Sequence, residues 1–151
     1  MSKKHVTLYS LYMAKDAYHN IVRTALEKDG WLITNDPLYL PKDYAGSRLE
    51  IDLGAEKIIV AERGLEKIAV EVKSFLKTSM INELHGVVGQ YLNYFLGLKR
   101  VEPDRTLYVA LPQNVYEKLE ELPLLSDLKA EIDFKLITFD IDNQVIISWI
   151  K

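Results

Sequence analysis

Residues 48–75 read RLEIDLGAEKIIVAERGLEKIAVEVKSF, and this stretch decides the fold class. Three runs within it are rich in β-branched and apolar residues, which predicts strands over Arg48–Leu53, Lys57–Glu62 and Lys67–Phe75. The second and third runs are separated by a short segment that contains Gly64, a residue type common in turns. We therefore expect these two strands to form a β-hairpin.

The third of these strands has two faces of different character. Because successive side chains of a strand point to opposite faces, one face carries the β-branched residues Ile68, Val70 and Val72. The opposite face carries Ala69, Glu71 and Lys73. A carboxylate and an ammonium group are therefore expected side by side near the end of the strand.

Two long amphipathic helices are predicted before and after this stretch. Apolar residues recur at helical spacing over Met13–Asp29 and over Thr78–Leu98, where Ser79 is the expected N-cap. Gly86 and Gly89 of the second helix are expected to permit close packing against a neighbour. The predicted apolar stripe of that helix is Ile81, Leu84, Val88, Tyr91, Phe95 and Leu98.

The remaining segments complete an α/β pattern. Leu38–Ser47 contains proline and glycine and is expected to be a loop or an edge segment. The order α-β-β-β-α-β, followed by a C-terminal hairpin, predicts a mixed central sheet flanked by helices. Further strands and short helices are predicted over Trp31–Thr34, Thr106–Leu111, Asn114–Leu122, Ser126–Glu131, Lys135–Phe139 and Val145–Ile150.

Composition and charge exclude several classes of protein. Of the 151 residues 48% are hydrophobic and 27% charged, which excludes a disordered or fibrous chain. The absence of cysteine excludes disulfide scaffolds, cysteine-based zinc sites and thiol catalysis. The formal net charge of −3 argues against nucleic-acid binding by bulk charge alone. No stretch is typical of a signal peptide or a membrane span, so we expect a cytoplasmic protein without membrane contact.

The candidate chemistry lies in Asp52, Glu71 and Lys73. If the strand that carries Asp52 lies beside the strand of Glu71, the two carboxylates can hold one hard divalent cation between them. Mg²⁺ or Mn²⁺ prefers oxygen ligands and keeps several waters, so the backbone carbonyl of Val72 would suffice as a third ligand. A metal-bound water loses its proton more readily, and the Lys73 ammonium can orient or stabilise the resulting hydroxide. The pattern therefore suits hydrolysis of a phosphodiester.

The Glu-x-Lys pair alone is a weak signal. An ion pair on the polar face of an amphipathic strand explains the tripeptide more often than a catalytic site does. The context favours chemistry, because a strand that carries Asp52 precedes the pair and a long helix follows it.

In this context the residues resemble a known family. Helix, three strands, helix and strand, with Asp52 and then Glu71-x-Lys73, are similar to the core of the PD-(D/E)XK nuclease superfamily. KDAYHNIVRTALEKDGWLITNDPL (15–38), the stretch quoted above and GQYLNYFLGL (89–98) closely resemble the XisH-type proteins, factors that control excision of a DNA element. The similarity covers 13–151, which we expect to be a single nuclease-like domain after an N-terminal extension of residues 1–12.

This resemblance implies a restriction-endonuclease-like fold and a function in DNA rearrangement. The implied activity is that of a metal-dependent DNA endonuclease, or of a nuclease-like subunit. The implied partners are DNA and other excision factors, such as an XisI-like protein. A homodimer rests on analogy with nucleases that cut both strands. The alternative, favoured by the acidic composition, is a non-catalytic accessory protein that keeps the fold and acts by binding a partner protein.

Residues on the two helices are weaker candidates. Gln90 and Tyr94 share a helix face and resemble the Gln-x-x-x-Tyr element that lines the active site of RecB-like nucleases, although an ordinary helix surface with one packed tyrosine is equally consistent. Many superfamily members place a metal-binding glutamate on the first helix. Glu27 is the candidate here, but a solvated glutamate is favoured. Asp16 and His19 could face the cleft together, but a surface or capping contact is favoured.

We predict that the first twelve residues are dispensable for folding. They precede the region of resemblance, and Met13 would itself make a natural start. Deletion of residues 1–12 should therefore change the thermal midpoint, followed by circular dichroism, by no more than a few degrees. A larger loss would show that the segment belongs to the folded domain.

Overall fold

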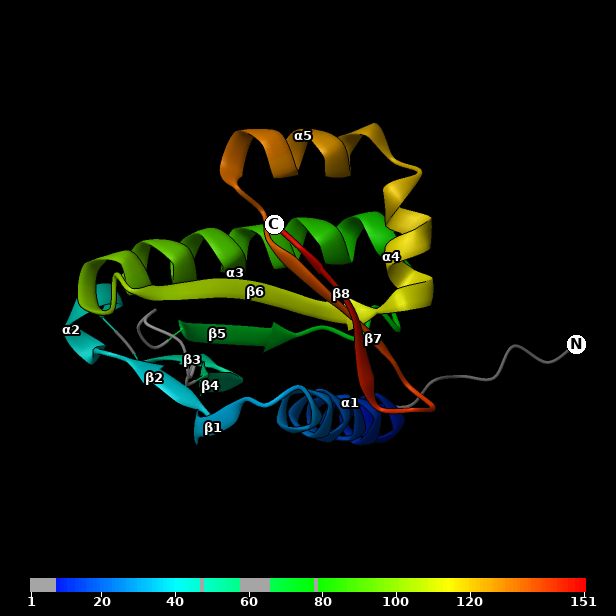
Figure 1. Cartoon of the computed structure of the whole chain (residues 1–151). Helices are drawn as coiled ribbons and strands as arrows, with labels where there is room; N and C mark the ends of the chain where they lie inside the picture. The colour runs from blue at the N-terminus through cyan, green and yellow to red at the C-terminus, as the bar shows by residue number, and fades with distance from the viewer. Residues whose placement is uncertain (1–7, 47, 58–65, 78) are drawn as a thin grey trace, which may run out of the picture.

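A six-stranded mixed sheet forms the centre of the structure, a computed structural model that describes residues 8–46, 48–57, 66–77 and 79–151 (Figure 1). The strands β5, β6 and β7 run parallel, whereas β1, β4 and β8 pair with their neighbours in antiparallel fashion. The expected α/β fold with a mixed, helix-flanked sheet is confirmed. In spatial order the strands are β1 (Leu32–Asn35), β4 (Leu53–Lys57), β5 (Glu66–Val72), β6 (Arg105–Pro112), β7 (Leu136–Asp140) and β8 (Val145–Ile150).

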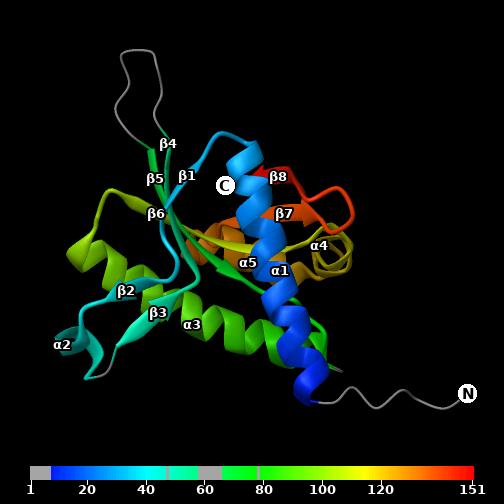
Figure 2. The same ribbon diagram turned by 90° about the horizontal axis from the view of Figure 1, so that it is seen from below.

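Helices cover both faces of this sheet. Figure 1 shows α1 (Leu8–Lys28) below the sheet and α3 (Met80–Val101) and α5 (Pro123–Ile132) above it. In the view from below, α1 crosses in front of the strands and α3 lies behind them (Figure 2). The short helix α4 (Gln113–Glu120) leads from β6 to α5. None of the helices in the described residues is long and apolar enough to cross a membrane.

The central strand β5 separates two hydrophobic cores. Ile68, Val70 and Val72 are buried in the core that also contains Val22 of α1. Ala69 is buried in the core under α3. The predicted alternation of side chains along this strand is therefore confirmed. Burial on both faces is typical of a strand with a parallel neighbour and fixes its position firmly, because each buried Ile or Val contributes about 1.5–3 kcal/mol.

Asp52 divides the strand that was predicted over Arg48–Leu53. The first part, β3 (Leu49–Ile51), pairs with β2 (Leu38–Leu40) in a separate two-stranded sheet that packs on the core under α3. The second part, β4, begins at Leu53 and joins the central sheet. The prediction of one continuous strand was wrong. Ile51 and Leu53 are both fully buried, so both look like strand residues in the sequence, and their residue types do not reveal that the chain turns from one sheet to the other between them.

Strand β4 contains Gly54, which the sequence placed after a strand. A Cβ atom on Gly54 would lie 3.1 Å from the Cβ of Asn35 in β1 and 3.3 Å from Nη1 of Arg105. The glycine thus allows β1 and the Arg105 side chain to approach β4 closely.

Apart from Lys57, the strand predicted over Lys57–Glu62 lies outside the described residues, as does Gly64. The described residues show β4 and β5 paired in antiparallel fashion through Leu53–Lys57, so the hairpin predicted from Lys57–Glu62 stays a prediction.

Each long helix extends beyond one of its predicted ends, α1 at its start and α3 at its end, which is Val101 rather than Leu98. Helix α1 begins at Leu8 rather than Met13, so part of the expected extension is helical. Helix α3 begins after Ser79, whose Oγ accepts a hydrogen bond from the backbone N–H of Asn82 at 3.3 Å, as the predicted N-cap requires. The segment predicted as a loop or an edge contains β2 and the short helix α2 (Lys42–Ala45).

The buried stripe of α3 differs from the predicted one. Ile81 is exposed, whereas Tyr94 is buried against the sheet. Gly86 and Gly89 have open space where a Cβ would lie, so the expected close packing at these glycines was wrong. They lie on the side of the helix that points away from the core.

We predict opposite effects of alanine at two glycines. Gly89→Ala should raise the free energy of unfolding by about 0.5–1 kcal/mol, because alanine favours the helix and meets no neighbour. Gly54→Ala should lower it by about 1–3 kcal/mol, because the added Cβ overpacks the contact with Asn35. Urea unfolding measures both. Equal effects of the two substitutions would contradict the close approach at Gly54.

Candidate functional site

The carboxylates of Asp52 and Glu71 meet at the C-terminal end of β5. Asp52 lies between β3 and β4, and the backbone N–H of Val72 donates to its Oδ2 at 2.8 Å. In the reverse direction, the N–H of Asp52 lies 3.4 Å from Oε2 of Glu71. The carboxylate of Asp52 is therefore held by the backbone of β5, and the carboxylate of Glu71 by the backbone of Asp52, so that the two acidic groups adjoin each other.

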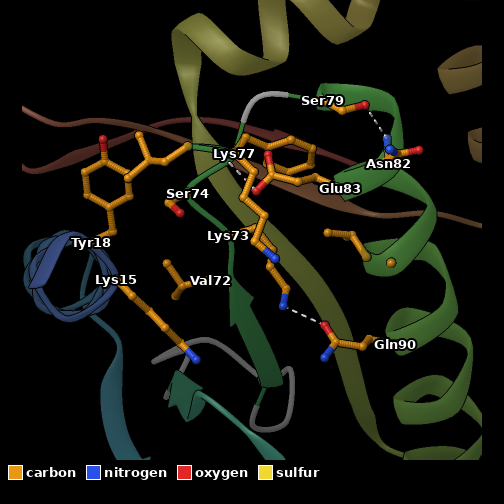
Figure 3. Close-up of a pocket in the computed structure, with 14 residues that line it drawn as sticks. Lys15, Tyr18, Val72, Lys73, Ser74, Lys77, Ser79, Asn82, Glu83 and Gln90 are labelled. Atoms are coloured by element: carbon orange, nitrogen blue, oxygen red, sulfur yellow. Dashed lines mark hydrogen bonds between the residues drawn. The ribbon is translucent and has the colours of Figure 1, made fainter. Parts of the chain in front are cut away.

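Lys73, the first residue after β5, adds an ammonium group to the carboxylate pair. Its backbone N–H donates to the carbonyl of Ala110 at 2.8 Å, which extends the pairing with β6 by one residue. Its Nζ lies 3.4 Å from Oε1 of Glu71 and donates to Oε1 of Gln90 on α3 at 2.6 Å (Figure 3). Lys73 thus joins the carboxylate pair to the opposite wall of the site.

Burial gives Glu71 an unusual proton affinity. Only 7% of the residue is exposed, and burial together with the negative charge of Asp52 raises the pKa of the Glu71 carboxyl to about 7. The Lys73 ammonium offsets part of this effect. Two carboxylates and one ammonium leave an excess of negative charge in a poorly solvated place, which a bound cation would relieve.

Gln90 and Tyr94 lie four residues apart on α3 but in different surroundings. Gln90 is exposed and holds the Lys73 ammonium, whereas Tyr94 is buried in the core under α3. Burial raises the pKa of the Tyr94 phenol to about 12, and the negative charges of Glu71, Asp52 and Glu50 contribute. The structure therefore brings Gln90 to Lys73 and packs Tyr94 in the core, and a role of Tyr94 in the site stays a prediction.

Helix α1 contributes His19, which the sequence had favoured as a surface residue beside Asp16. The imidazole Nε2 lies 2.7 Å from Oδ1 of Asp36, and Nδ1 lies 4.0 Å from Oδ1 of Asp52. Asp36 also binds Arg23. This chain of contacts ties α1 to the carboxylate pair, whereas Asp16 is exposed.

The role of Asp36 was missed because its place after a strand and before Pro37 indicated only a turn. Glu27 pairs with Arg23 through Oε1 and Nε at 3.2 Å, and 51% of its side chain is exposed. The favoured interpretation of Glu27 as a solvated residue is therefore confirmed.

An open cleft of about 850 Å³ is lined by Val72, Lys73 and Gln90, whereas Asp52 and Glu71 are not among the residues that line it. Residues of α1 form one wall, residues of α3 form the other, and Val72, Lys73 and the chain that follows them lie between (Figure 3). A substrate that entered this cleft would reach Lys73 directly.

The acidic residues fit a hard cation by their chemistry. Among the described residues, no group of three or more histidine, aspartate and glutamate side chains lies close enough to hold a metal ion. Asp52 and Glu71 alone offer carboxylate oxygens, which is the donor type that Mg²⁺ and Mn²⁺ prefer, and Mg²⁺ is commonly held by one or two carboxylates and several waters. The raised pKa of Glu71 is consistent with a place that favours added positive charge.

Comparisons with known proteins identify the relatives of this chain. Residues 12–147 match the family described as XisH protein. The fold is similar to the crystal structure of an XisH family protein from Nostoc punctiforme, with a TM-score of 0.79, 42% identity, and coverage of 90% of this chain and 100% of that one. It is also similar to a fdxN element excision controlling factor protein from Anabaena variabilis, with a TM-score of 0.78, 42% identity and coverage of 90% and 99%. No curated protein matches the sequence.

We predict a pH-dependent gain of stability in Glu71→Gln without divalent cations. The folded state holds the Glu71 proton with a pKa of about 7, against an ordinary value of 4.5. The stability that this affinity contributes is complete below pH 4.5 and is lost as the pH rises through 7.

The neutral amide should avoid this loss. Compared with the parent, the variant should therefore gain roughly 3 kcal/mol of unfolding free energy between these pH values, at ~1.4 kcal/mol per pKa unit. Urea unfolding in chelator measures it, with the exposed Glu120→Gln as control. A gain that is the same at every pH would contradict the raised pKa.

Proposed function

The chain belongs to the XisH family, and we propose that it is a metal-dependent DNA endonuclease, or a nuclease-like subunit, that controls excision of a DNA element. The excision role is supported by the relative that is named as an excision controlling factor. The nuclease role is supported by one observation, the convergence of Asp52 and Glu71 with Lys73, which lines an open cleft.

The topology supports a restriction-endonuclease-like fold of the PD-(D/E)XK superfamily. Helix α1 precedes the antiparallel strands β1, β4 and β5 of the central sheet, and α3 then leads to β6, which lies parallel to β5. The expected nuclease core has this order of elements. The acidic pair lies at the end of β5, where the chain leaves the sheet towards α3.

The residues take distinct roles in the proposed reaction. Asp52, Glu71 and the backbone carbonyl of Val72 would hold Mg²⁺ or Mn²⁺, which when bound lowers the pKa of water and neutralises charge on the phosphodiester. Lys73 orients the attacking water, and Gln90 fixes the position of its ammonium. Tyr94 closes the site from the core side, and His19 steadies Asp52 from α1.

A second candidate is a non-catalytic accessory protein that acts by binding a partner protein. The formal charge of −3 favours it, because a nuclease that binds DNA unaided would usually be basic. Under either function, the proposed partners are DNA and other excision factors, including an XisI-like protein. A homodimer would suit a nuclease that cuts both strands.

We predict that Asp52→Asn and Lys73→Ala each abolish Mn²⁺-dependent nicking of supercoiled DNA. The first removes a carboxylate ligand and the second removes the ammonium, while Asn keeps an acceptor for the Val72 N–H. The exposed charges Asp127 and Lys118 offer matched controls, and Asp127→Asn and Lys118→Ala should nick as the parent does.

Calorimetric titration with Mn²⁺ separates the two candidate functions. The nuclease should bind Mn²⁺ and Asp52→Asn should bind it at least tenfold more weakly. Nicking that persists in both site variants would refute the assigned roles, and no Mn²⁺ binding at millimolar concentration would favour the accessory function.

A further inference from the structure

The cleft beside Lys73 has an excess of positive charge. Among the described residues, its lining includes Lys15 on α1, Lys77 in the segment between β5 and α3, and Lys73, whose ammonium also pairs with Glu71, against the carboxylate of Glu83. One oxygen of that carboxylate is already bound by the backbone N–H of Lys77 at 3.3 Å. Figure 3 shows the three lysines along the cleft, with Lys15 and Lys73 extending towards its lower end. The charge therefore complements a phosphate backbone.

The same cleft has aromatic walls. Tyr18 of α1 and Phe75 of the segment after β5 both line it, and both are half-buried. Tyr18 is braced by an edge-on contact with Phe139, with 6.1 Å between ring centroids. Phe75 packs against the core under α3. Two rings held from behind provide surfaces on which a nucleobase can stack.

The small number of lysines and the aromatic lining of the cleft together favour unpaired DNA over a continuous duplex. Bases in a duplex are stacked on each other and unavailable to aromatic side chains, so duplex binding depends mainly on contacts with many phosphates. Three lysines line the cleft in the part of the chain that the structure describes, and the whole chain has a formal charge of −3. An unpaired base adds stacking energy that does not depend on charge, which compensates for weak electrostatic attraction.

We propose that the cleft between α1 and α3 binds an unpaired nucleotide beside the scissile phosphate, so that single-stranded or flapped DNA is the substrate. This inference rests on the proposed function, because it takes DNA as the ligand of the site. It adds the substrate class, which the family resemblance and the carboxylate pair leave open.

The test measures binding in chelator, with Asp52→Asn as a cleavage-deficient background. The probe is 2-aminopurine, placed in a single strand, in the flap of a flapped duplex and in a blunt duplex of the same sequence. The first two should bind at least tenfold more tightly than the third, and the fluorescence of the unpaired base should fall as it stacks. Equal affinity for the blunt duplex would overturn the proposal.

Substitutions then locate the base. Tyr18→Ala and Phe75→Ala should each weaken single-strand binding by roughly tenfold, whereas Tyr18→Phe keeps the ring and should bind like the background protein. Tyr39, a half-exposed tyrosine on β2 outside the cleft, provides the matched control Tyr39→Ala. Lys77→Ala should reduce the salt dependence of binding. Thermal midpoints of all variants identify any that fail to fold.

The outcomes distinguish this proposal from the proposed function. If DNA is nicked with Mn²⁺ but Tyr18→Ala and Phe75→Ala bind as Tyr39→Ala does, the unpaired-nucleotide site is refuted and the nuclease remains. If the parent nicks nothing but unpaired DNA binds through both rings, the cleft proposal is supported and the catalytic role fails.

Discussion

The hydrogen bond from the Val72 N–H to the Asp52 carboxylate is the contact on which the site depends. It joins the end of β5 to the bend between β3 and β4, where the chain passes from the small sheet to the central one. The reverse contact, from the Asp52 N–H to Glu71, aligns the second carboxylate with the first. Two like charges are thereby kept adjacent at a place with little water, and their repulsion is built into the folded state.

The two faces of the sheet supply different parts of the site. From one face, α1 brings His19 to Asp52 and places Tyr18 and Lys15 on the cleft. From the other, α3 brings Gln90 to Lys73. The carboxylates lie at the end of β5, which is buried between both cores and is therefore among the least movable parts of the molecule. A rigid strand that positions acidic groups between two helices is well suited to chemistry on a bound strand of nucleic acid.

The sequence predicted the architecture well in the elements whose buried side chains recur at the regular spacing of a helix or a strand. The alternation of Ile68, Val70 and Val72 and the two long helices were predicted because apolar spacing directly reflects the faces that pack. The same patterns could not place Asp52 at a bend between two sheets or show that Asp36 binds His19, since both depend on contacts between distant segments. Asp52, Glu71 and Lys73 were predicted as a group from their strand context, but the burial that raises the pKa of Glu71 could come only from the folded structure.

The proposed function requires that Asp52 and Glu71 form one cation site. Anomalous diffraction from crystals soaked in millimolar Mn²⁺ tests it most directly. We expect a single strong peak between the two carboxylates in the parent protein and its loss in Asp52→Asn. A parent crystal in which Mn²⁺ binds elsewhere, while the space between Asp52 and Glu71 shows no anomalous density, would contradict the claim.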